Sequence, residues 1–408
     1  MCQSCGLPNL IHHPEVQESG LPNRRAFMVG SSALAAAALL SVNEAGAQET
    51  AAVDGSAEAG IPARGYAAEK VGAALKPFSF TRRNLRSDDV LIDIQYAGIC
   101  HTDLHWVNGD FGPSLPFTMV PGHEITGRVS AVGASVSKFK VGDIAGVGCL
   151  VDSCGTCRNC KRGLEQYCLN GYTLTYGSVD RHGFNTQGGY SNKIVVKEAF
   201  AFKIPDSVNL AAVTPLLCAG ITTFSPMQRW NVGTDQKVAV LGLGGLGHVA
   251  LKLFKARGAD VTVFTTSEGK LPDALRMGAT EAILWSDTAA FERLKGQFDF
   301  ILATVPYPFD FNPFVDLLGL DGVFTNVGLV VPASMPNLPN LIEGRKSITG
   351  SAIGGVPETQ EVLDYCLKRN ITADIELIPI DHVNDAYRRV RDKDIRYRFV
   401  IDMTTLPN

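Results

Sequence analysis

Residues 237–248 read Lys-Val-Ala-Val-Leu-Gly-Leu-Gly-Gly-Leu-Gly-His. The apolar run Lys237–Leu241 is typical of a buried strand, and Leu246–Arg257 has the periodicity of a helix. Between them lie the glycines of a G-x-G-x-x-G motif: Gly242, Gly244 and Gly247. In this context the first glycine allows a tight turn, the second lets the backbone approach a pyrophosphate, and the third lets helix and strand pack closely. The stretch predicts a dinucleotide-binding unit, and a structural turn without a ligand is the alternative.

Strand and helix patterns alternate downstream of this motif. The predicted elements are strands at Val261–Thr265, Phe298–Leu302 and Gly322–Val327, helices at Leu271–Met277 and Glu358–Arg369, and then strand-like sequence to Met403. Such alternation predicts an α/β fold with a doubly wound parallel sheet. Upstream, Gly-rich turns separate strand patterns at Val90–Ala97, Ile125–Val132 and Val141–Val147. We therefore expect a second, β-rich part that extends to about Leu217.

The end of the second strand bears on which dinucleotide is bound. NAD-binding units usually place a carboxylate there for the ribose 2′-hydroxyl. Here residues 265–270 read Thr-Thr-Ser-Glu-Gly-Lys. The hydroxyls of Thr266 and Ser267 and the ammonium of Lys270 suit a 2′-phosphate better, and Glu268 is the one residue that does not fit. We expect NADP(H) to be preferred over NAD(H).

Four cysteines crowd into one short segment, with the spacing Cys154-x2-Cys157-x2-Cys160-x7-Cys168. Four thiolates so close in sequence can close a tetrahedral zinc site with no open position, which is typical of a structural zinc. An iron–sulfur cluster and a chance group of free thiols are the alternatives.

Further metal-ligand residues are dispersed along the chain. Cys100 begins the run Cys-His-Thr-Asp-Leu-His, His123 and Glu124 follow Pro-Gly, and Cys218 lies in an apolar segment just before the dinucleotide-binding unit. Spacing alone leaves open whether Cys218 is a core cysteine and His123 an ordinary turn histidine. The nearby nucleotide-binding unit and the polar residues beside Cys100 favour a joint metal site.

Composition excludes two classes of partner. The 408 residues carry 37 Lys and Arg against 41 Asp and Glu, a net charge of −4, without a basic block. We therefore expect no nucleic-acid partner. No apolar run reaches the ~18–20 residues that span a bilayer, so we expect no stable membrane anchor.

The N-terminus has the features of an export signal. Arg24 and Arg25 precede a short Ala-rich apolar stretch, and Ala45-Gly46-Ala47 resembles a cleavage site. This pattern predicts a twin-arginine signal peptide over residues 1–47, a linker over 48–60, the twin-arginine translocase as a partner, and a periplasmic location. A frayed helical extension, or an inefficient leader that leaves the protein in the cytoplasm, is the alternative.

The chain resembles the zinc-dependent medium-chain alcohol dehydrogenases, in particular the cinnamyl-alcohol-dehydrogenase branch and its bacterial broad-range aldehyde reductases. The motifs that carry the resemblance are GICHTDLH (98–105), VPGHE (120–124), the four-Cys segment, LLCAGITTFSP (216–226), GLGGLGH (242–248), GSAIGG (350–355) and RYRFVID (396–402). The resemblance implies a GroES-like catalytic domain over 61–217 and 355–408, with a structural-zinc lobe at 150–170, and a Rossmann domain over 218–354. It also implies two zinc ions per chain, and many relatives form homodimers.

Site residues follow from the resemblance, position by position. Cys100, His123 and Cys218 would bind the catalytic zinc, with Glu124 as an exchangeable fourth ligand and Asp103 supporting the imidazole of His123. Thr102 and His105 would relay a proton. Cofactor contacts would come from Thr222, Gly242, Gly244, Gly245, Leu246, Gly247, Thr266, Ser267 and Lys270. Trp106, Phe111, Pro113, Tyr172, Ala352 and Ile353 would shape the substrate pocket.

These residues imply hydride transfer between NADP(H) and an aldehyde or primary alcohol. The apolar and aromatic pocket residues favour aromatic or medium aliphatic aldehydes. A non-catalytic zinc- and nucleotide-binding protein is one alternative, and a zinc-free reductase of the same superfamily is another.

Overall fold

The computed structural model describes residues 60–112, 118–328 and 334–407. The predicted export signal, nearly all of the predicted linker, and Pro113 lie outside these residues. Among the described residues no single helix is long and apolar enough to cross a membrane, although one bent pair, Leu210–Leu217 with Ala219–Arg229, passes on length and composition.

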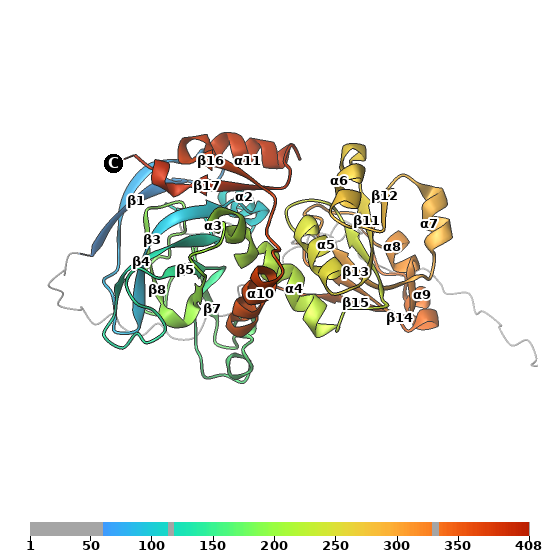
Figure 1. Ribbon diagram of the computed structural model, residues 1–408, viewed down its shortest axis with the longest axis horizontal. Helices are drawn as coiled ribbons and strands as arrows, with labels where there is room; N and C mark the ends of the chain where they lie inside the picture. The colour runs from blue at the N-terminus through green and yellow to red at the C-terminus, as the bar shows by residue number, and fades with distance from the viewer. Residues whose placement is uncertain (1–59, 113–117, 329–333, 408) are drawn as a thin grey trace, which may run out of the picture. The chain divides into compact units, whose positions relative to one another are not determined.

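A six-stranded parallel sheet begins with the strand that precedes the glycine motif (Figure 1). Its order, β12-β11-β10-β13-β14-β15, is that of a Rossmann sheet. The strands are β10 (Lys237–Leu241), β11 (Asp260–Thr265), β12 (Glu281–Leu284), β13 (Phe298–Ala303), β14 (Leu318–Asn326) and β15 (Ser347–Gly350). The α/β prediction is therefore confirmed.

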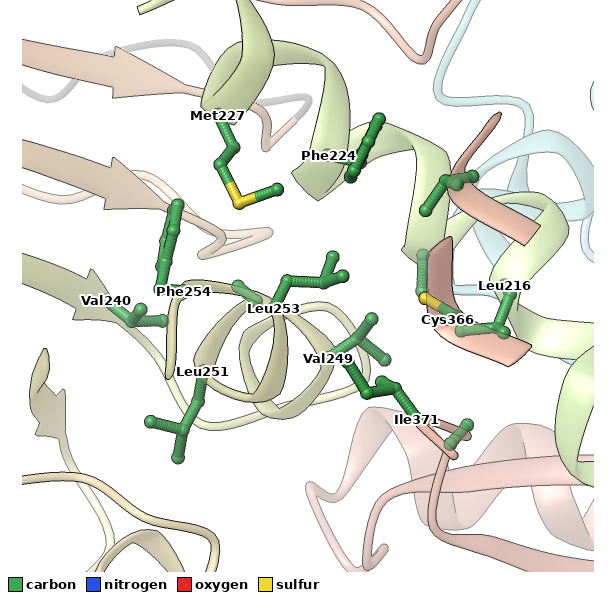
Figure 2. Close-up of a cluster of buried hydrophobic side chains, with 14 of the residues drawn as sticks. Leu216, Phe224, Met227, Val240, Val249, Leu251, Leu253, Phe254, Cys366 and Ile371 are labelled. Atoms are coloured by element: carbon green, nitrogen blue, oxygen red, sulfur yellow. The ribbon is translucent and has the colours of Figure 1, made fainter. Parts of the chain in front are cut away.

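Helices cover both faces of this sheet. Alternate side chains of the central strand, β10, lie on opposite faces, and both sets are buried. Val238 and Val240 belong to one apolar cluster, and Ala239 and Leu241 belong to another. Figure 2 shows the first cluster, in which the apolar side of α5 packs beside Val240 and against Phe224 of α4. The helices of this region are α4 (Ala219–Arg229), α5 (Gly247–Ala256), α6 (Leu271–Arg276), α7 (Thr288–Leu294), α8 (Asn312–Asp316), α9 (Leu338–Gly344) and α10 (Val356–Lys368).

The β-rich part contains a seven-stranded sheet and two strand pairs (Figure 1). The sheet order is β16-β17-β3-β4-β5-β9, and β8 also pairs with β3. These strands are β3 (Asp89–Gly98), β4 (Ile125–Val132), β5 (Ile144–Val147), β8 (Lys193–Lys197), β9 (Ala201–Lys203), β16 (Ile375–Pro379) and β17 (Arg398–Asp402). The pairs are β1 (Ile61–Ala67) with β2 (Lys76–Arg82), and β6 (Leu150–Ser153) with β7 (Tyr172–Leu174). Carboxyl-terminal strands thus complete the sheet that the N-terminal half begins.

Further helices and 3₁₀ turns lie in the remaining connections. The α-helices are α2 (His101–Asn108), α3 (Leu210–Val213) and α11 (Val383–Arg391). Single 3₁₀ turns occur at Cys160–Arg162, Glu165–Tyr167, Glu198–Phe200, Thr214–Leu217, Glu268–Lys270, Ile380–His382 and Met403–Thr405.

Two predicted elements differ from the structure. The strand predicted from Val141 begins only at Ile144, because Gly142 (φ +97°) turns the chain and leaves Val141 60% exposed. The strand-like sequence predicted up to Met403 contains α11, which buries only Val383, Ala386 and Tyr387 and is otherwise highly charged. The segment carries a helical signal that the strand prediction overlooked, because Val383, Ala386, Tyr387 and Val390 recur at the i, i+3, i+4, i+7 spacing of one helix face.

Candidate active site

Four buried side chains from three parts of the chain meet at one end of the β-rich sheet. They are Cys100, His123, Glu124 and Cys218, and their ligand atoms lie within 4.8 Å of one another. The Sγ atoms of Cys100 and Cys218 are 4.0 Å apart. Two thiols, an imidazole and a carboxyl group at this separation are a donor set that fits a zinc ion.

Strand pairing brings three of these residues together. β3 runs antiparallel to β4 with Ala97 opposite Ile125, and the Gly98 N–H donates to the Glu124 carbonyl at 2.9 Å. A Cβ on Gly98 would lie 2.0 Å from Glu124 Oε2, so this glycine leaves the space that the carboxyl group occupies. Cys218 arrives separately, between the Thr214–Leu217 turn and α4.

Asp103 fixes the imidazole of His123. Its Oδ1 accepts from His123 Nδ1 (3.0 Å), the Tyr176 hydroxyl (2.6 Å) and the Gly122 N–H (3.2 Å). Its Oδ2 accepts from the Cys100 N–H (2.9 Å) and the Tyr190 hydroxyl (3.1 Å). With the proton on Nδ1, Nε2 is the nitrogen left to bind a metal. Sequence reasoning missed both tyrosines, which lie 73 and 87 residues beyond Asp103.

Protonation in this cluster is tightly coupled. The hydrogen bond from the Cys218 thiol lowers the pKa of Cys100 well below 9 and raises the pKa of Cys218. Burial acts to lower the pKa of His123, but the Asp103 carboxylate outweighs it and the pKa rises well above 6.5. Because zinc binds thiolates and neutral imidazole, loading this site with metal must release protons.

Arg398 links the metal-ligand cluster to the glycine motif. Its Nη2 donates to both carboxyl oxygens of Glu124 at 2.5 Å, and both side chains are buried. Burial raises the pKa of Glu124 to about 8, and the guanidinium opposes that rise. A Cβ on Gly245 would lie 2.8 Å from Arg398 Cδ, so the same side chain also packs on the motif. Sequence reasoning gave Arg398 no role, because it lies 274 residues from Glu124.

Thr102 and His105 lie on α2 beside this cluster. The Thr102 hydroxyl is 3.6 Å from Cys100 Sγ. His105 Nδ1 is 2.7 Å from Asp110 Oδ2, and its Nε2 is buried without a hydrogen-bond partner among the described residues. A carboxylate on Nδ1 holds the proton there, so Nε2 is an acceptor that a hydroxyl of a bound cofactor would satisfy.

The glycine motif leaves room for a dinucleotide. Gly242 adopts φ +90°, and a Cβ on Gly247 would lie 1.8 Å from the Gly242 carbonyl oxygen. A Cβ on Gly244 would meet no atom within 4 Å, so open space lies beside this part of the loop. Leu246 caps α5, whose N-terminus follows directly and favours a bound phosphate.

The predicted ribose-binding residues follow β11. Thr266 and Glu268 are exposed, and Ser267 and Lys270 are partly buried. Lys270 Nζ donates to the Leu243 carbonyl at 3.0 Å. Burial, followed by the charge of Arg396, lowers the pKa of Lys270. Lys270 thus faces the glycine motif.

Thr222 lies on α4, one turn beyond Cys218. Its N–H donates to the Cys218 carbonyl at 2.9 Å, and its hydroxyl is 4.0 Å from Cys218 Sγ. The predicted cofactor residue therefore adjoins the metal-ligand cluster.

The four clustered cysteines form a second group whose ligand atoms lie within 4.8 Å of one another. Backbone N–H groups point at the sulfurs, from Cys157 to Cys154 (3.3 Å), from Cys160 to Cys157 (3.5 Å) and from Cys154 to Cys168 (3.4 Å). The N–H groups of Cys157 and Thr156 lower the pKa of Cys154 to about 5, whereas burial raises the pKa of Cys160 to about 12. Four thiols in this arrangement fit a closed tetrahedral zinc site.

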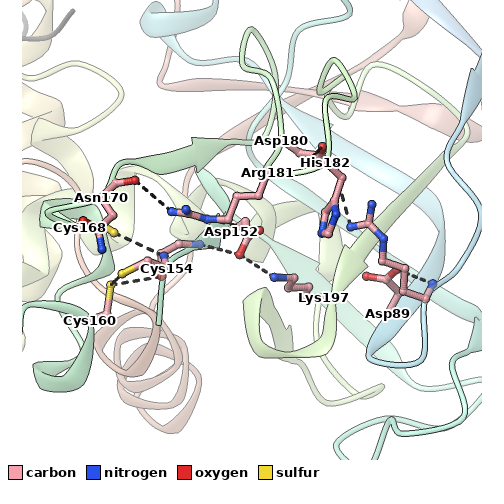
Figure 3. A network of polar contacts seen from close by, with 12 residues as sticks. Asp89, Asp152, Cys154, Cys160, Cys168, Asn170, Asp180, Arg181, His182 and Lys197 are labelled. Carbon is pink, nitrogen blue, oxygen red and sulfur yellow. Dashed lines mark hydrogen bonds and ion pairs between the residues drawn. The ribbon is translucent and has the colours of Figure 1, made fainter. Parts of the chain in front are cut away.

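Polar contacts tie this lobe to the rest of the chain (Figure 3). Arg181 donates to the Asn170 carbonyl (3.3 Å) and lies 3.9 Å from Asp152, which also pairs with Lys197 of β8 at 2.8 Å. On another side, Glu165 accepts from the Val356 N–H at 2.8 Å and the Tyr167 hydroxyl accepts from the Ala352 N–H at 3.1 Å. The lobe therefore supports the 352–356 segment.

The predicted pocket residues separate into groups. Trp106 and Phe111 are neighbours, with ring centroids 5.0 Å apart, and Tyr176 lies 5.9 Å from Trp106. Ile353 lines a small apolar cavity that Cys149 and Leu217 also line, whereas Ala352 is exposed. Tyr172 lies on β7 opposite Ser153, at the four-Cys lobe. The tyrosine next to Trp106 is Tyr176. Pro113 is outside the described residues.

Two family models match this chain. Residues 86–206 match the alcohol dehydrogenase GroES-like domain, and residues 245–368 match the zinc-binding dehydrogenase model.

Curated relatives and solved structures agree with these matches. NADP-dependent alcohol dehydrogenase C 1 of Mycolicibacterium smegmatis is 52% identical over 344 residues, which cover 84% of this chain and 98% of the relative. Aldehyde reductase YahK of Escherichia coli is 48% identical over 336 residues, covering 81% and 95%. A cinnamyl alcohol dehydrogenase from Sorghum bicolor superposes with a TM-score of 0.81 at 40% identity, covering 84% and 98%. CAD from Helicobacter pylori complexed with NADP(H) superposes with a TM-score of 0.80 at 39% identity, covering 84% and 99%.

Proposed function

The chain belongs to the zinc-type medium-chain alcohol dehydrogenase family, and on that premise we propose that it is an NADP(H)-dependent alcohol dehydrogenase or aldehyde reductase. The observation that carries the proposal is the buried group of Cys100, His123, Glu124 and Cys218, which adjoins the glycine motif through Arg398. A metal site beside a dinucleotide site suits hydride transfer to a carbonyl, because the metal would polarise the carbonyl group that receives the hydride.

Cys100, His123 and Cys218 would hold the catalytic zinc, and Cys154, Cys157, Cys160 and Cys168 would hold a second, structural zinc. When bound, the catalytic metal supplies a Lewis acid for the carbonyl oxygen and the reduced nicotinamide supplies the hydride. Glu124 stays paired with Arg398, and it is near enough to serve as an exchangeable ligand.

The chain's own residues manage the proton. The Thr102 hydroxyl, next to Cys100 Sγ, gives a proton to the product oxygen, and His105, after taking up a proton from solvent at Nε2, restores the proton of Thr102. Asp110 keeps the His105 Nδ1 proton in place, so that Nε2 is the nitrogen that exchanges protons. Asp103 keeps the ring of His123 oriented for metal binding.

The substrate is an aromatic or medium aliphatic aldehyde, or the matching primary alcohol. Trp106, Phe111 and Tyr176 form a run of aromatic rings beside α2. Aromatic surfaces recognise apolar substrates by burial and ring contacts and offer little to a sugar or a charged acid.

The experiment that tests this function uses the full chain supplied with zinc. We expect rapid NADPH consumption with benzaldehyde and hexanal, slower consumption with NADH, two zinc ions per chain, and loss of activity after chelation. Zinc-loaded protein that binds NADPH but reduces no aldehyde would favour a non-catalytic zinc- and nucleotide-binding protein. Activity that survives chelation would favour a zinc-free reductase.

We also propose that two copies pair through β15, the edge strand of the nucleotide-binding sheet. Apolar side chains near this edge are exposed, namely Leu320 (69%), Leu338 (61%), Ile342 (77%) and Ile348 (37%). A homodimer would bury them and extend the sheet. Light scattering should give twice the chain mass, and Ile342→Glu should lower it.

The export signal remains a proposal as well. Arg24 and Arg25 support twin-arginine export to the periplasm, after zinc and cofactor have bound in the cytoplasm. Cell fractionation tests this location: Arg24→Lys with Arg25→Lys should keep the protein in the cytoplasm, and the same distribution for wild type and variant would contradict it.

A further inference from the structure

Arg396 lies against the turn that follows β11, although it comes from the carboxyl-terminal segment just before β17. Its Nη2 donates to the Gly269 carbonyl at 3.1 Å, and its Nη1 lies 3.1 Å from Asp273 Oδ2. The side chain is 56% exposed. These two contacts use two of the five guanidinium N–H donors, so the others remain available to a ligand at this turn.

Lys270 is less well placed for a ligand beyond the turn. Its ammonium donates to the Leu243 carbonyl and lies 5.5 Å above the ring of Tyr397. The lysine is thus directed back toward the glycine motif, and Arg396 is the more exposed cation beside Gly269.

Asp273 does not neutralise this positive charge. The carboxylate is shared, because Arg276 pairs with its Oδ1 at 2.7 Å while Arg396 and the Tyr397 hydroxyl (2.7 Å) share Oδ2. One negative charge therefore faces two guanidinium groups and Lys270 adds a third cation; with Glu268, the exposed carboxylate of the same turn, one positive charge is left in excess. The excess of positive charge favours an anionic group at the turn.

We propose that Arg396 is a specificity-determining residue that binds the 2′-phosphate of NADP(H). The inference rests on the proposed function, since the turn after β11 is where a Rossmann sheet receives the adenosine ribose. Asp273 and Gly269 hold the guanidinium in a fixed orientation, so binding a phosphate costs little additional ordering. Cofactor selection is thereby shared between the nucleotide-binding sheet and the carboxyl-terminal segment.

The test compares two arginines that share one carboxylate. Arg396→Gln removes the cation beside Gly269, and Arg276→Gln is the matched control, because Arg276 also pairs with Asp273 and is 67% exposed. The probes are adenosine 2′,5′-bisphosphate and adenosine 5′-monophosphate, titrated calorimetrically into the full chain. Cofactor turnover with NADPH and NADH is measured in parallel.

In Arg396→Gln we expect the affinity for the bisphosphate, and kcat/KM for NADPH, to fall about tenfold, as for one lost charge-assisted contact. Binding of the monophosphate and kcat/KM for NADH should change less than twofold. Arg276→Gln should leave all four values within twofold, and Arg396→Lys should keep most of the preference.

Three results would overturn the inference. An unchanged bisphosphate affinity in Arg396→Gln would show that Lys270 suffices, and would leave the proposed NADP(H) dependence intact. Equal losses for both probes would assign Arg396 a structural role. A wild-type chain that binds both probes equally would refute the cofactor preference itself, independently of any variant.

Discussion

Asp103→Asn should weaken the catalytic zinc site without affecting the four-Cys site. The amide oxygen must face His123 Nδ1 on the Oδ1 side, which places the NH₂ group where Oδ2 accepts from the Cys100 N–H. That buried N–H then has no acceptor. The Tyr190 hydroxyl can rotate to accept from the amide, but the backbone of Cys100 cannot adapt in this way.

The size of the effect follows from this one lost contact. A hydrogen bond to a charged group contributes about 1.5–3 kcal/mol, which corresponds to about 10–150-fold in affinity. Replacing the outer partner of a metal-binding histidine typically costs about 10–100-fold in metal affinity. We therefore expect the affinity of the catalytic site for zinc to fall about 10–100-fold.

Chelator competition, followed by metal analysis of the dialysed protein, measures this change. At a chelator concentration at which wild type keeps two zinc ions, Asp103→Asn should keep one. Asp110→Asn is the matched control, because Asp110 pairs with the other histidine, His105, and is half exposed. Equal loss from both sites in Asp103→Asn would indicate unfolding, and unchanged retention would refute the role given to Asp103.

Three further predictions concern the relay, the glycine motif and pH. His105→Ala should lower kcat about 100-fold or more through loss of proton transfer while both zinc ions stay bound; metal analysis that shows zinc loss would argue against a relay. Gly244→Ala should weaken NADPH binding with little change in Tm. Gly247→Ala should weaken binding and also lower Tm, because only the Cβ added at residue 247 would collide with backbone atoms. Equal Tm values for the two variants would contradict this prediction. Burial lowers the pKa of His248 to about 3, so the unfolded chain gains a proton below about 6.5 that the folded chain does not, and stability must fall as pH decreases through that range. His248→Gln should therefore lose less Tm than wild type between about pH 7 and pH 5.

The sequence predicted most accurately those elements whose apolar pattern is complete within one short segment. The strand predicted at Lys237–Leu241 matches β10, and the helix predicted at Leu246–Arg257 matches α5 except for its two terminal residues. Both are buried elements whose apolar periodicity is continuous. Four of the nine residues of α11 are charged, so its apolar residues form no continuous run although their spacing is helical, and the helix escaped prediction.

At the candidate site, sequence patterns identified residues that carry a recognisable motif. They did not identify Tyr176, Tyr190 or Arg398, each of which reaches the site from a distant segment. What assembles these contacts is strand register and tertiary packing, such as the pairing of β17 with β3. No local pattern encodes that register.

Three consecutive residues, of which the last begins β17, contact two separate regions of the chain. Arg396 contacts Gly269, Tyr397 donates to Asp273, and Arg398 donates to Glu124. The segment therefore tolerates substitution better than a change of length, because one inserted or deleted residue would displace all three contacts at once. Attempts to re-engineer cofactor preference here should exchange side chains at constant length, since a shorter or longer segment would also shift the partner of the metal-site carboxylate.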